Sequence, residues 1–307
     1  MKVYLNRLPK TGPWGGGIKT VNKLVESLKS KGHDVVFSLH DTDIDVIFCI
    51  DPRPNHLGEW YQNFLDYKLN FPAVKIVQRL GDLGTHSKPE LTQLVRQTLN
   101  FSDHFIFPSE WAHEWIGFQK ENKNIVHNAP MPIFHKSKRE NFSPSKRLRV
   151  VTHHWSMNPK KGFDFYQKLE DHCNLTNEFE FTYIGRLPDH VKIKNHILPL
   201  DAMLLAKQLP EHDVYLTASI EEAGANHVLE AMASGLPVVY RANGGSIENY
   251  CESYGERFEN FEELLSQLRH ISSNYRKYKE RVLSYENVND RVVDKYIEIM
   301  ERINVIK

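Results

Sequence analysis

Two glutamates, Glu222 and Glu230, have the spacing most suggestive of chemistry, with seven residues between them. Glu222 precedes a predicted helix and Glu230 lies on its second turn. Asn226 suits the N-cap of this helix, and Gly235-Leu-Pro237 ends it. The free N–H groups and partial positive charge of a helix N-terminus favour a diphosphate. The two carboxylates would then accept hydrogen bonds from hydroxyls, one set on a sugar and one on a ribose.

The segments around this pair alternate between strands and helices. Residues 213–218 and 237–240 are β-rich runs on either side of the helix. A second such unit begins with a strand over 150–154, continues through the loop Trp155–Gly162 and enters a helix over 163–173. A third opens the chain, with a strand over 1–5, a glycine loop over 13–17 and a helix. The pattern predicts two Rossmann-like halves, each with a loop after its first strand that can approach a ligand closely.

A composition shift separates the two halves. Residues 130–149 are rich in proline, serine and basic side chains, and they predict an interdomain linker. Contact of this basic run with anionic lipid is the alternative, which would make the protein peripheral at a membrane.

Several of these motifs together resemble the retaining glycosyltransferases of family 4, which have the GT-B fold. The resemblance rests on Glu222-x7-Glu230 with Glu-Ala-Met-Ala-Ser-Gly-Leu-Pro-Val-Val following, on Lys161-Gly162, and on the glycine loop before a helix that ends in Gly32-His33. It implies two Rossmann-like α/β/α domains facing across a cleft. Residues 1–145 would bind the acceptor and 146–287 the nucleotide-sugar donor, with a C-terminal helix over 288–307 bracing the first domain.

The resemblance also implies roles for single residues. Lys161 would pair with the donor diphosphate and Glu222 would orient the sugar, which makes these two the expected catalytic residues; Glu230 would hold the ribose. The backbone near Leu198 and Leu200 would hold the base. The other expected donor contacts are Gly16, Gly17, Ser156, Lys160, Arg186, Gly224, Ala225, Asn226 and His227.

Two departures from the family pattern affect the expected site. Ser156 stands where the family usually has an arginine, so Lys160 or Arg186 would have to supply that charge. Ala225 occupies the usual glycine position, which changes the path of the loop before the helix. In the first half, Arg79 and Asp82 follow a buried strand and are candidate acceptor contacts, with an internal salt bridge as the alternative.

The function implied is transfer of a hexose-like sugar, with retention, from a UDP- or GDP-linked donor to a hydroxyl of a glycan or lipid-linked acceptor, as in polysaccharide biosynthesis. No cofactor or metal is expected, because Asp41-Thr-Asp43 fits a capped turn better than a cation site. Two alternatives keep the fold: a catalytically degenerate protein that binds nucleotide or a partner only, and a sugar-nucleotide epimerase or phosphorylase.

Composition limits the remaining classes. The 39 basic and 39 acidic side chains balance, so charge does not favour nucleic-acid binding. Three widely spaced cysteines indicate buried thiols in a reducing compartment rather than disulfides or a zinc site. The sequence shows no signal peptide and no long apolar run, and it predicts a cytoplasmic protein.

Overall fold

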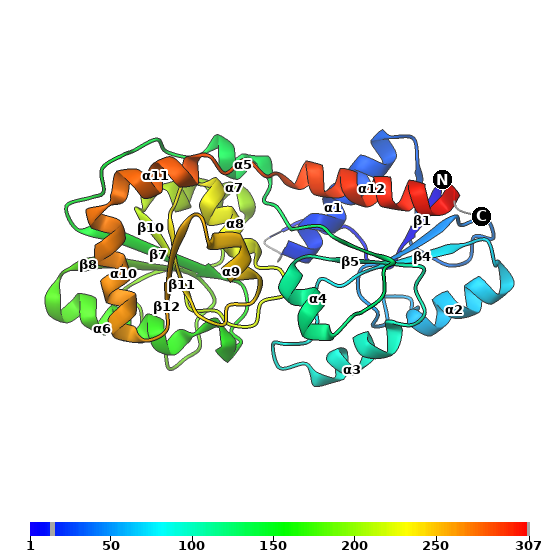
Figure 1. Cartoon of the computed structure of the whole chain (residues 1–307), viewed down its shortest axis with the longest axis horizontal. Coiled ribbons are helices and arrows are strands. Elements are labelled where there is room, and N and C mark those ends of the chain that lie inside the picture. The colour runs from blue at the N-terminus through cyan, green and yellow to red at the C-terminus, as the bar shows by residue number, and fades with distance from the viewer. Residues whose placement is uncertain (13–15, 306–307) are drawn as a thin grey trace. The chain divides into compact units, whose positions relative to one another are not determined.

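The computed structural model describes residues 1–12 and 16–305. The chain divides into two compact units, Met1–Asn128 with Asn289–Lys307 (unit 1) and Ala129–Val288 (unit 2). Each unit contains one six-stranded parallel sheet with helices packed around it (Figure 1). The three cysteines are buried and free of disulfides, as the sequence predicts. Within the described ranges, no helix is both long and apolar enough to cross a membrane.

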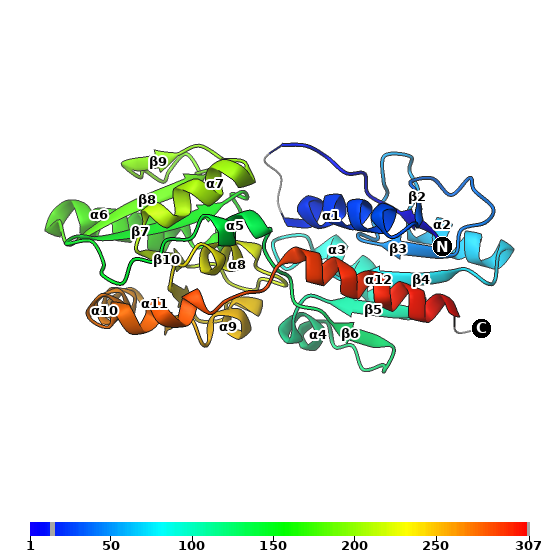
Figure 2. The ribbon, with the colours of Figure 1, turned by 90° about the horizontal axis from the view of Figure 1, so that it is seen from above.

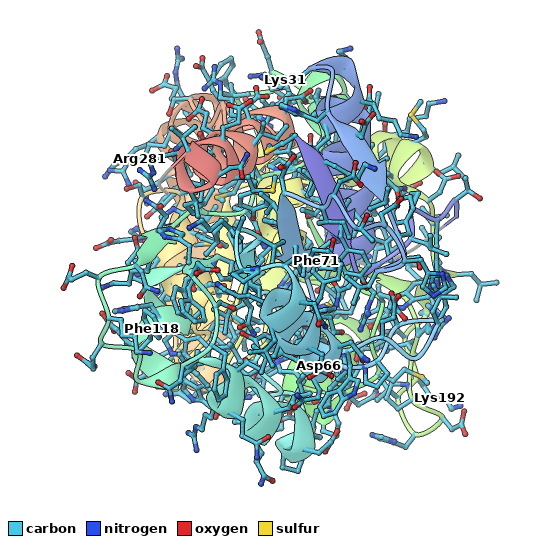
Figure 3. All side chains as sticks on the ribbon, turned by 90° about the vertical axis from the view of Figure 1, so that its right-hand side faces the viewer. Lys31, Asp66, Phe71, Phe118, Lys192 and Arg281 are labelled. Carbon is cyan, nitrogen blue, oxygen red and sulfur yellow. The ribbon has the colours of Figure 1, made fainter. Side chains whose placement is uncertain are left out.

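Unit 1 has the strand order β2-β1-β3-β4-β5-β6. Its strands are β1 (Lys2–Leu5), β2 (Asp34–Val36), β3 (Val46–Cys49), β4 (Lys75–Arg79), β5 (His104–Phe107) and β6 (Lys123–Ile125). Its helices are α1 (Gly16–Ser30), α2 (Tyr61–Asn70), α3 (Pro89–Thr98), α4 (Glu110–Ile116) and α12 (Asn289–Val305). Aromatic rings fill much of the core, and the ring centroid of Phe118 lies 4.6 Å from that of Phe105 and 5.4 Å from that of Phe107. Figure 3 labels Phe118 among the side chains drawn as sticks.

The last helix of the chain, α12, lies beside α1 in unit 1 (Figure 2). One ion pair links it to α1 at Lys23–Asp290 (2.6 Å), and a second links it to the residue that follows α1, at Lys31–Asp294 (3.2 Å). Its Tyr296 is fully buried, and the hydroxyl accepts a hydrogen bond from Arg79 Nε at 2.9 Å. The C-terminal segment is therefore part of the core of unit 1 although the whole of unit 2 precedes it in sequence.

Unit 2 has the strand order β12-β11-β10-β7-β8-β9. Its strands are β7 (Leu148–His154), β8 (Phe179–Gly185), β9 (Asn195–Ile197), β10 (Val214–Thr217), β11 (Val238–Arg241) and β12 (Gly255–Phe258). Its helices are α5 (Pro132–Lys136), α6 (Phe163–Thr176), α7 (Ala202–Gln208), α8 (Asn226–Ala233), α9 (Ser246–Cys251), α10 (Phe261–Ser273) and α11 (Tyr275–Leu283), with 3₁₀ turns η1 (Pro159–Lys161) and η2 (Leu209–Glu211).

The boundary between the units lies at Asn128–Ala129, earlier than the expected boundary at 145–146. The predicted linker is folded onto unit 2, because α5 buries Phe134 in the same apolar core as Leu229 and Met232 of α8. Its basic side chains are also used within unit 2: Arg149 pairs with Asp213 at 3.4 Å, and Arg147 donates to the Phe179 carbonyl at 2.8 Å. Residues 130–149 are therefore folded onto unit 2 and do not form a solvated linker. These contacts give no support to the alternative that the basic side chains bind anionic lipid.

A buried lysine on α11 fixes the end of α8. Lys279 is 2% exposed, and its Nζ donates to the carbonyl of Gly235 at 2.6 Å. Gly235 follows α8 with a left-handed φ of 81°. Burial lowers the pKa of Lys279 from 10.5 to about 8, against the attraction of Asp213 and with Arg139 and Lys138 acting in the same direction as burial.

This shift predicts a pH-dependent stability difference between the wild type and Lys279→Met. Between about pH 8 and 10.5 the unfolded chain binds more protons at Lys279 than the folded chain, so the wild type should gain stability relative to the variant as pH rises. We expect the difference to grow by at least about 1 kcal/mol over this window and to be flat below it. Urea unfolding of both proteins at pH 7, 8.5 and 10 measures it. Parallel pH profiles would show that Lys279 titrates alike in both states.

Candidate donor site in unit 2

The expected site residues of unit 2 gather where the strand order reverses. After β7 the chain adds β8 and β9 on one side of β7, and it then adds β10, β11 and β12 on the other side. The parallel neighbours β7 and β10 are therefore followed by strands on opposite sides of the sheet. Ligands of parallel α/β sheets bind outside the carboxyl ends of strands at such a switch point. Lys160 and Lys161 follow β7, and Glu222 follows β10. The switch point therefore brings together two segments that are far apart in sequence.

Backbone hydrogen bonds hold three loops of this site in one arrangement. The Ile220 N–H donates to the Lys160 carbonyl at 2.9 Å and joins the loop after β10 to η1. The Glu222 N–H donates to the Gly244 carbonyl at 3.1 Å, and the Ser246 N–H donates back to the Glu222 carbonyl at 2.8 Å. The N–H and the carbonyl of Glu222 are thus both hydrogen-bonded to the glycine turn after β11. These bonds fix the position of the Glu222 Cα atom, from which the side chain extends.

Gly162 allows the close approach of η1 to the end of β10. Its φ is 80°, and a Cβ added there would lie 2.5 Å from the Cβ and from the carbonyl oxygen of Ala218. Any larger residue would push η1, and with it Lys161, away from Glu222. The glycine of the Lys161-Gly162 pair is therefore a packing requirement of the site.

Two parallel ion pairs connect the loops: Lys161 with Glu222 and Lys160 with Glu221. The Lys161–Glu222 side chains are only 11% and 14% exposed, whereas the Lys160–Glu221 pair is more exposed. The attraction in the inner pair is consequently less screened by water. The two expected catalytic residues therefore neutralise each other in the protein without ligand.

The N-terminus of α8 differs in detail from its predicted form. The helix begins at Asn226, so Ala225 and not Asn226 is the N-cap. The Ala225 N–H donates to Ser246 Oγ at 3.0 Å, which removes it from the expected anion contacts. The next N–H groups, of Asn226 and His227, lie in the first turn, where a helix offers no internal acceptor. These are the backbone donors left for an anion; Gly224 lies just before them.

The side chain of His227 adds no charge to this helix end. Its ring is buried between other side chains, with centroids 5.0 Å from His154 and 6.2 Å from Tyr215, and Nε2 lies 3.1 Å from Thr217 Oγ1. Burial lowers the pKa of His227 to about 3, outweighing the attraction of Glu222. The imidazole is neutral at physiological pH, so only the backbone of His227 suits an anion.

Glu230 is held by a residue that the sequence pattern did not identify. The carboxylate is buried at 5% exposure, and its Oε2 lies 3.0 Å from Nε2 of His153 on β7. Successive residues of a strand point to opposite faces, so His153 and His154 are expected to have different partners. In the structure His154 Nε2 instead lies 2.7 Å from the Tyr166 hydroxyl. The one feature of the sequence that could have identified His153 as a site residue is its place near the carboxyl end of the first strand of the unit.

Arg186 packs against the loop that contains Ser156. Its guanidinium carbon is 3.9 Å from the ring centroid of Trp155, beside the exposed Ser156, and its backbone N–H donates to the His154 carbonyl at 3.2 Å. The expected base contacts lie further along the same edge: β9 ends at Ile197, Leu198 is 71% exposed, and Leu200 is half-buried. An open hollow of about 500 Å³ lined by Leu187, Lys192 and Lys194 contains none of the expected site residues.

The expected residues of unit 1 have other surroundings. Gly16 and Gly17 begin α1 and so are not in a loop, and residues 13–15 of the predicted glycine loop lie outside the described residues. Arg79 is buried; besides its bond to Tyr296 of α12 it donates to Asn128 Oδ1 at 2.9 Å, so its guanidinium is engaged within unit 1. Asp82 pairs with Lys88 at 2.6 Å.

The Asp41-Thr-Asp43 turn also pairs within unit 1. Lys2 Nζ lies 2.6 Å from a carboxylate oxygen of Asp43 and 3.7 Å from one of Asp41. One lysine therefore pairs with both acids of this segment.

Known structures share this architecture. No family model matches the chain, and neither does any curated protein. WaaG, a glycosyltransferase involved in lipopolysaccharide biosynthesis, is 16% identical with a TM-score of 0.69, over 98% of this chain and 99% of WaaG. Sucrose-phosphate synthase from Thermosynechococcus elongatus is 12% identical with a TM-score of 0.64, over 98% and 97%. The catalytic domain of starch synthase IV from Arabidopsis thaliana, bound to ADP and acarbose, is 14% identical with a TM-score of 0.66, over 99% of both chains.

At this level of identity the similarity establishes the fold. The two parallel-sheet units have the GT-B fold, which confirms the prediction of two Rossmann-like α/β domains.

Proposed function

We propose that this protein is a retaining glycosyltransferase that moves a hexose-like sugar from a nucleoside diphosphate to an acceptor hydroxyl. The observation that carries the proposal is the meeting of Lys161, Glu222 and the N-terminus of α8 at the switch point of unit 2. A cation and helix N–H groups suit the diphosphate, and carboxylates suit sugar and ribose hydroxyls. The similar GT-B fold of HepE from Anabaena, in complex with UDP and glucose, supports a donor of this kind at 13% identity and a TM-score of 0.62.

The Lys161–Glu222 pair indicates how a donor would be received. The diphosphate competes with Glu222 for the ammonium of Lys161, because phosphate oxygens are strong charge-assisted acceptors. Glu222 is then released to accept hydrogen bonds from the sugar hydroxyls next to the diphosphate. Binding would therefore exchange one internal ion pair for two ligand contacts. Neither the charge of Lys161 nor that of Glu222 would be left buried from water without a polar partner.

Bond breaking asks the protein chiefly to stabilise negative charge. The bond between the anomeric carbon and the phosphate oxygen breaks, and its electron pair stays on the departing diphosphate. Lys161 and the N–H groups of Asn226 and His227 stabilise that charge in the transition state. The acceptor oxygen bonds to the anomeric carbon on the same face, and its proton passes to the leaving phosphate oxygen. This scheme needs no metal, and Glu230 contributes binding to the ribose.

The acceptor and the cellular setting follow from the same proposal at a coarser level. A glycan or a lipid-linked sugar would supply the hydroxyl, as in the assembly of a polysaccharide. A binding protein without turnover is the second candidate, favoured by Ser156 in the place of an arginine and by the neutralised Lys161–Glu222 pair.

Incubation with radiolabelled UDP- and GDP-hexoses, with and without an acceptor mixture, tests the proposal. We expect acceptor-dependent product with one donor and full activity in EDTA, because Lys161 and α8 supply the positive charge. Nucleoside diphosphate should also raise the midpoint of thermal unfolding, since a ligand at a hundredfold excess over Kd stabilises by about 2.7 kcal/mol. Nucleotide-induced stabilisation without turnover favours the binding protein. Activity that EDTA abolishes and Mg²⁺ restores contradicts the metal-free scheme.

A further inference from the structure

His153 and Glu230 form a buried pair across the switch point of unit 2. His153 is 8% exposed and belongs to β7, whereas Glu230 belongs to the helix that follows β10. The 3.0 Å contact between His153 Nε2 and Glu230 Oε2 joins these elements beneath the N-terminus of α8. A carboxylate so far from water needs a hydrogen-bonded partner, because an uncompensated buried charge is costly.

The imidazole of His153 is fixed from several sides. The Tyr215 hydroxyl donates to the His153 carbonyl at 3.3 Å and accepts from its backbone N–H at 3.2 Å. The rings of Tyr215 and His153 also pack edge to face, with centroids 5.4 Å apart. Bonding to the carboxylate requires a proton on Nε2, and the other ring nitrogen, Nδ1, is buried with no hydrogen-bond partner in the described part of the chain. The side chain is therefore committed to Glu230.

Three histidines lie close together here, yet their ring nitrogens do not converge on one point. Nε2 of His153, His154 and His227 lies against Glu230, Tyr166 and Thr217 respectively. Among the described residues, no group of three or more metal-binding side chains is arranged for an ion. The cluster is therefore a set of separate hydrogen-bonded pairs, and only the His153–Glu230 pair includes a side chain that is expected to bind the ligand.

We propose that His153 is the positioning residue for Glu230, and that selection of a ribonucleotide over its 2′-deoxy counterpart depends on this pair. The inference rests on the proposed function, in which Glu230 meets the ribose hydroxyls. A glutamate side chain has several rotatable bonds, and fixing one carboxylate oxygen by a buried N–H donor removes most of that freedom before ligand arrives. The donated hydrogen bond also holds the carboxylate in one orientation toward the ribose hydroxyls.

Calorimetric titration with UDP, GDP, dUDP and dGDP tests this role directly. The wild type should bind the preferred ribonucleotide about tenfold more tightly than its 2′-deoxy form, since one such hydrogen bond corresponds to roughly a factor of ten. His153→Leu should weaken ribonucleotide binding about tenfold and leave the deoxy form nearly unchanged, which brings the ratio close to one. His153→Gln, whose amide can place a donor near the position of Nε2, should restore most of the ratio.

Matched variants separate positioning from folding. His154→Gln alters the neighbouring histidine and should leave the ratio unchanged. In Glu230→Gln the ratio should already be lost, so adding His153→Leu should reduce it no further. If His153→Leu does not fold, His153→Asn, whose amide is too short to reach Glu230, replaces it with the same expectation. Equal weakening of ribo and deoxy forms, or an unchanged ratio, overturns the inference.

The outcomes also distinguish this inference from the proposed function. A wild type that binds none of the four nucleotides removes the proposed function and the inference together. A wild type that binds ribo and deoxy forms equally removes only the inference and leaves the donor site in place.

Discussion

Replacing Lys161 with alanine is expected to lower kcat about a hundredfold or more, the loss typical of removing one donor to a developing oxyanion. Lys161 meets the diphosphate most strongly as charge leaves the sugar, so its contribution is larger in the transition state than in the bound donor. The KM for donor should therefore change much less than kcat. Steady-state rates with the donor identified in the turnover assay measure both quantities.

Two comparisons make this result specific. Lys160→Ala removes a lysine of the same turn, but one whose partner Glu221 is more exposed, and it should cost clearly less. Lys161→Ala also removes the ammonium that pairs with the shielded Glu222 carboxylate, so the double variant Lys161→Ala/Glu222→Gln should regain stability without regaining turnover. A Lys161→Ala enzyme with near-wild-type kcat would move the role to Lys160 or to Arg186 beside Trp155.

Glu222→Gln should affect turnover and product binding in opposite directions. Loss of a charged acceptor for the sugar hydroxyls is worth about 1.5 to 3 kcal/mol, so kcat should fall by roughly ten- to a hundredfold. The same change removes the carboxylate that pairs with Lys161, and nucleoside diphosphate should bind several-fold more tightly. Kinetics with the full donor and calorimetry with the nucleoside diphosphate give the two numbers.

The neighbouring acid provides the control for this experiment. Glu221→Gln removes the same charge from the more exposed pair and should change nucleoside diphosphate affinity less. Should Glu222→Gln abolish nucleotide binding while Glu230→Gln leaves it intact, the sugar and ribose ends of the site are reversed. If neither glutamate affects rate or binding, the motif is structural and the transferase proposal fails.

The sequence by itself determined the architecture and most of the local elements. Apolar strands alternating with amphipathic helices require parallel sheets covered by helices, because only that arrangement buries strands that are apolar on both faces. Helix stop signals such as Gly235-Leu-Pro237 and the spacing of Glu222 and Glu230 are local properties, and the structure retains both. Two such halves in succession predicted two Rossmann-like domains, whereas the GT-B fold was implied by the resemblance to family 4 and is confirmed by the similar structures.

Tertiary structure alone decided which residues meet. No local segment of the sequence determines the order of the strands. The neighbouring positions of β7 and β10 nevertheless place Lys161 against Glu222 and His153 against Glu230. The boundary between the units likewise depended on the tertiary structure. Composition suggested that residues 130–149 form a linker, but Phe134 of this segment is buried in the core of unit 2. The sequence predicted that Arg79, at the end of a strand, contacts the acceptor. In the structure its guanidinium donates a hydrogen bond to the hydroxyl of Tyr296, near the end of the chain. Periodicity and caps are set by interactions within a few residues, whereas these contacts span more than sixty residues and depend on how the whole sheet packs.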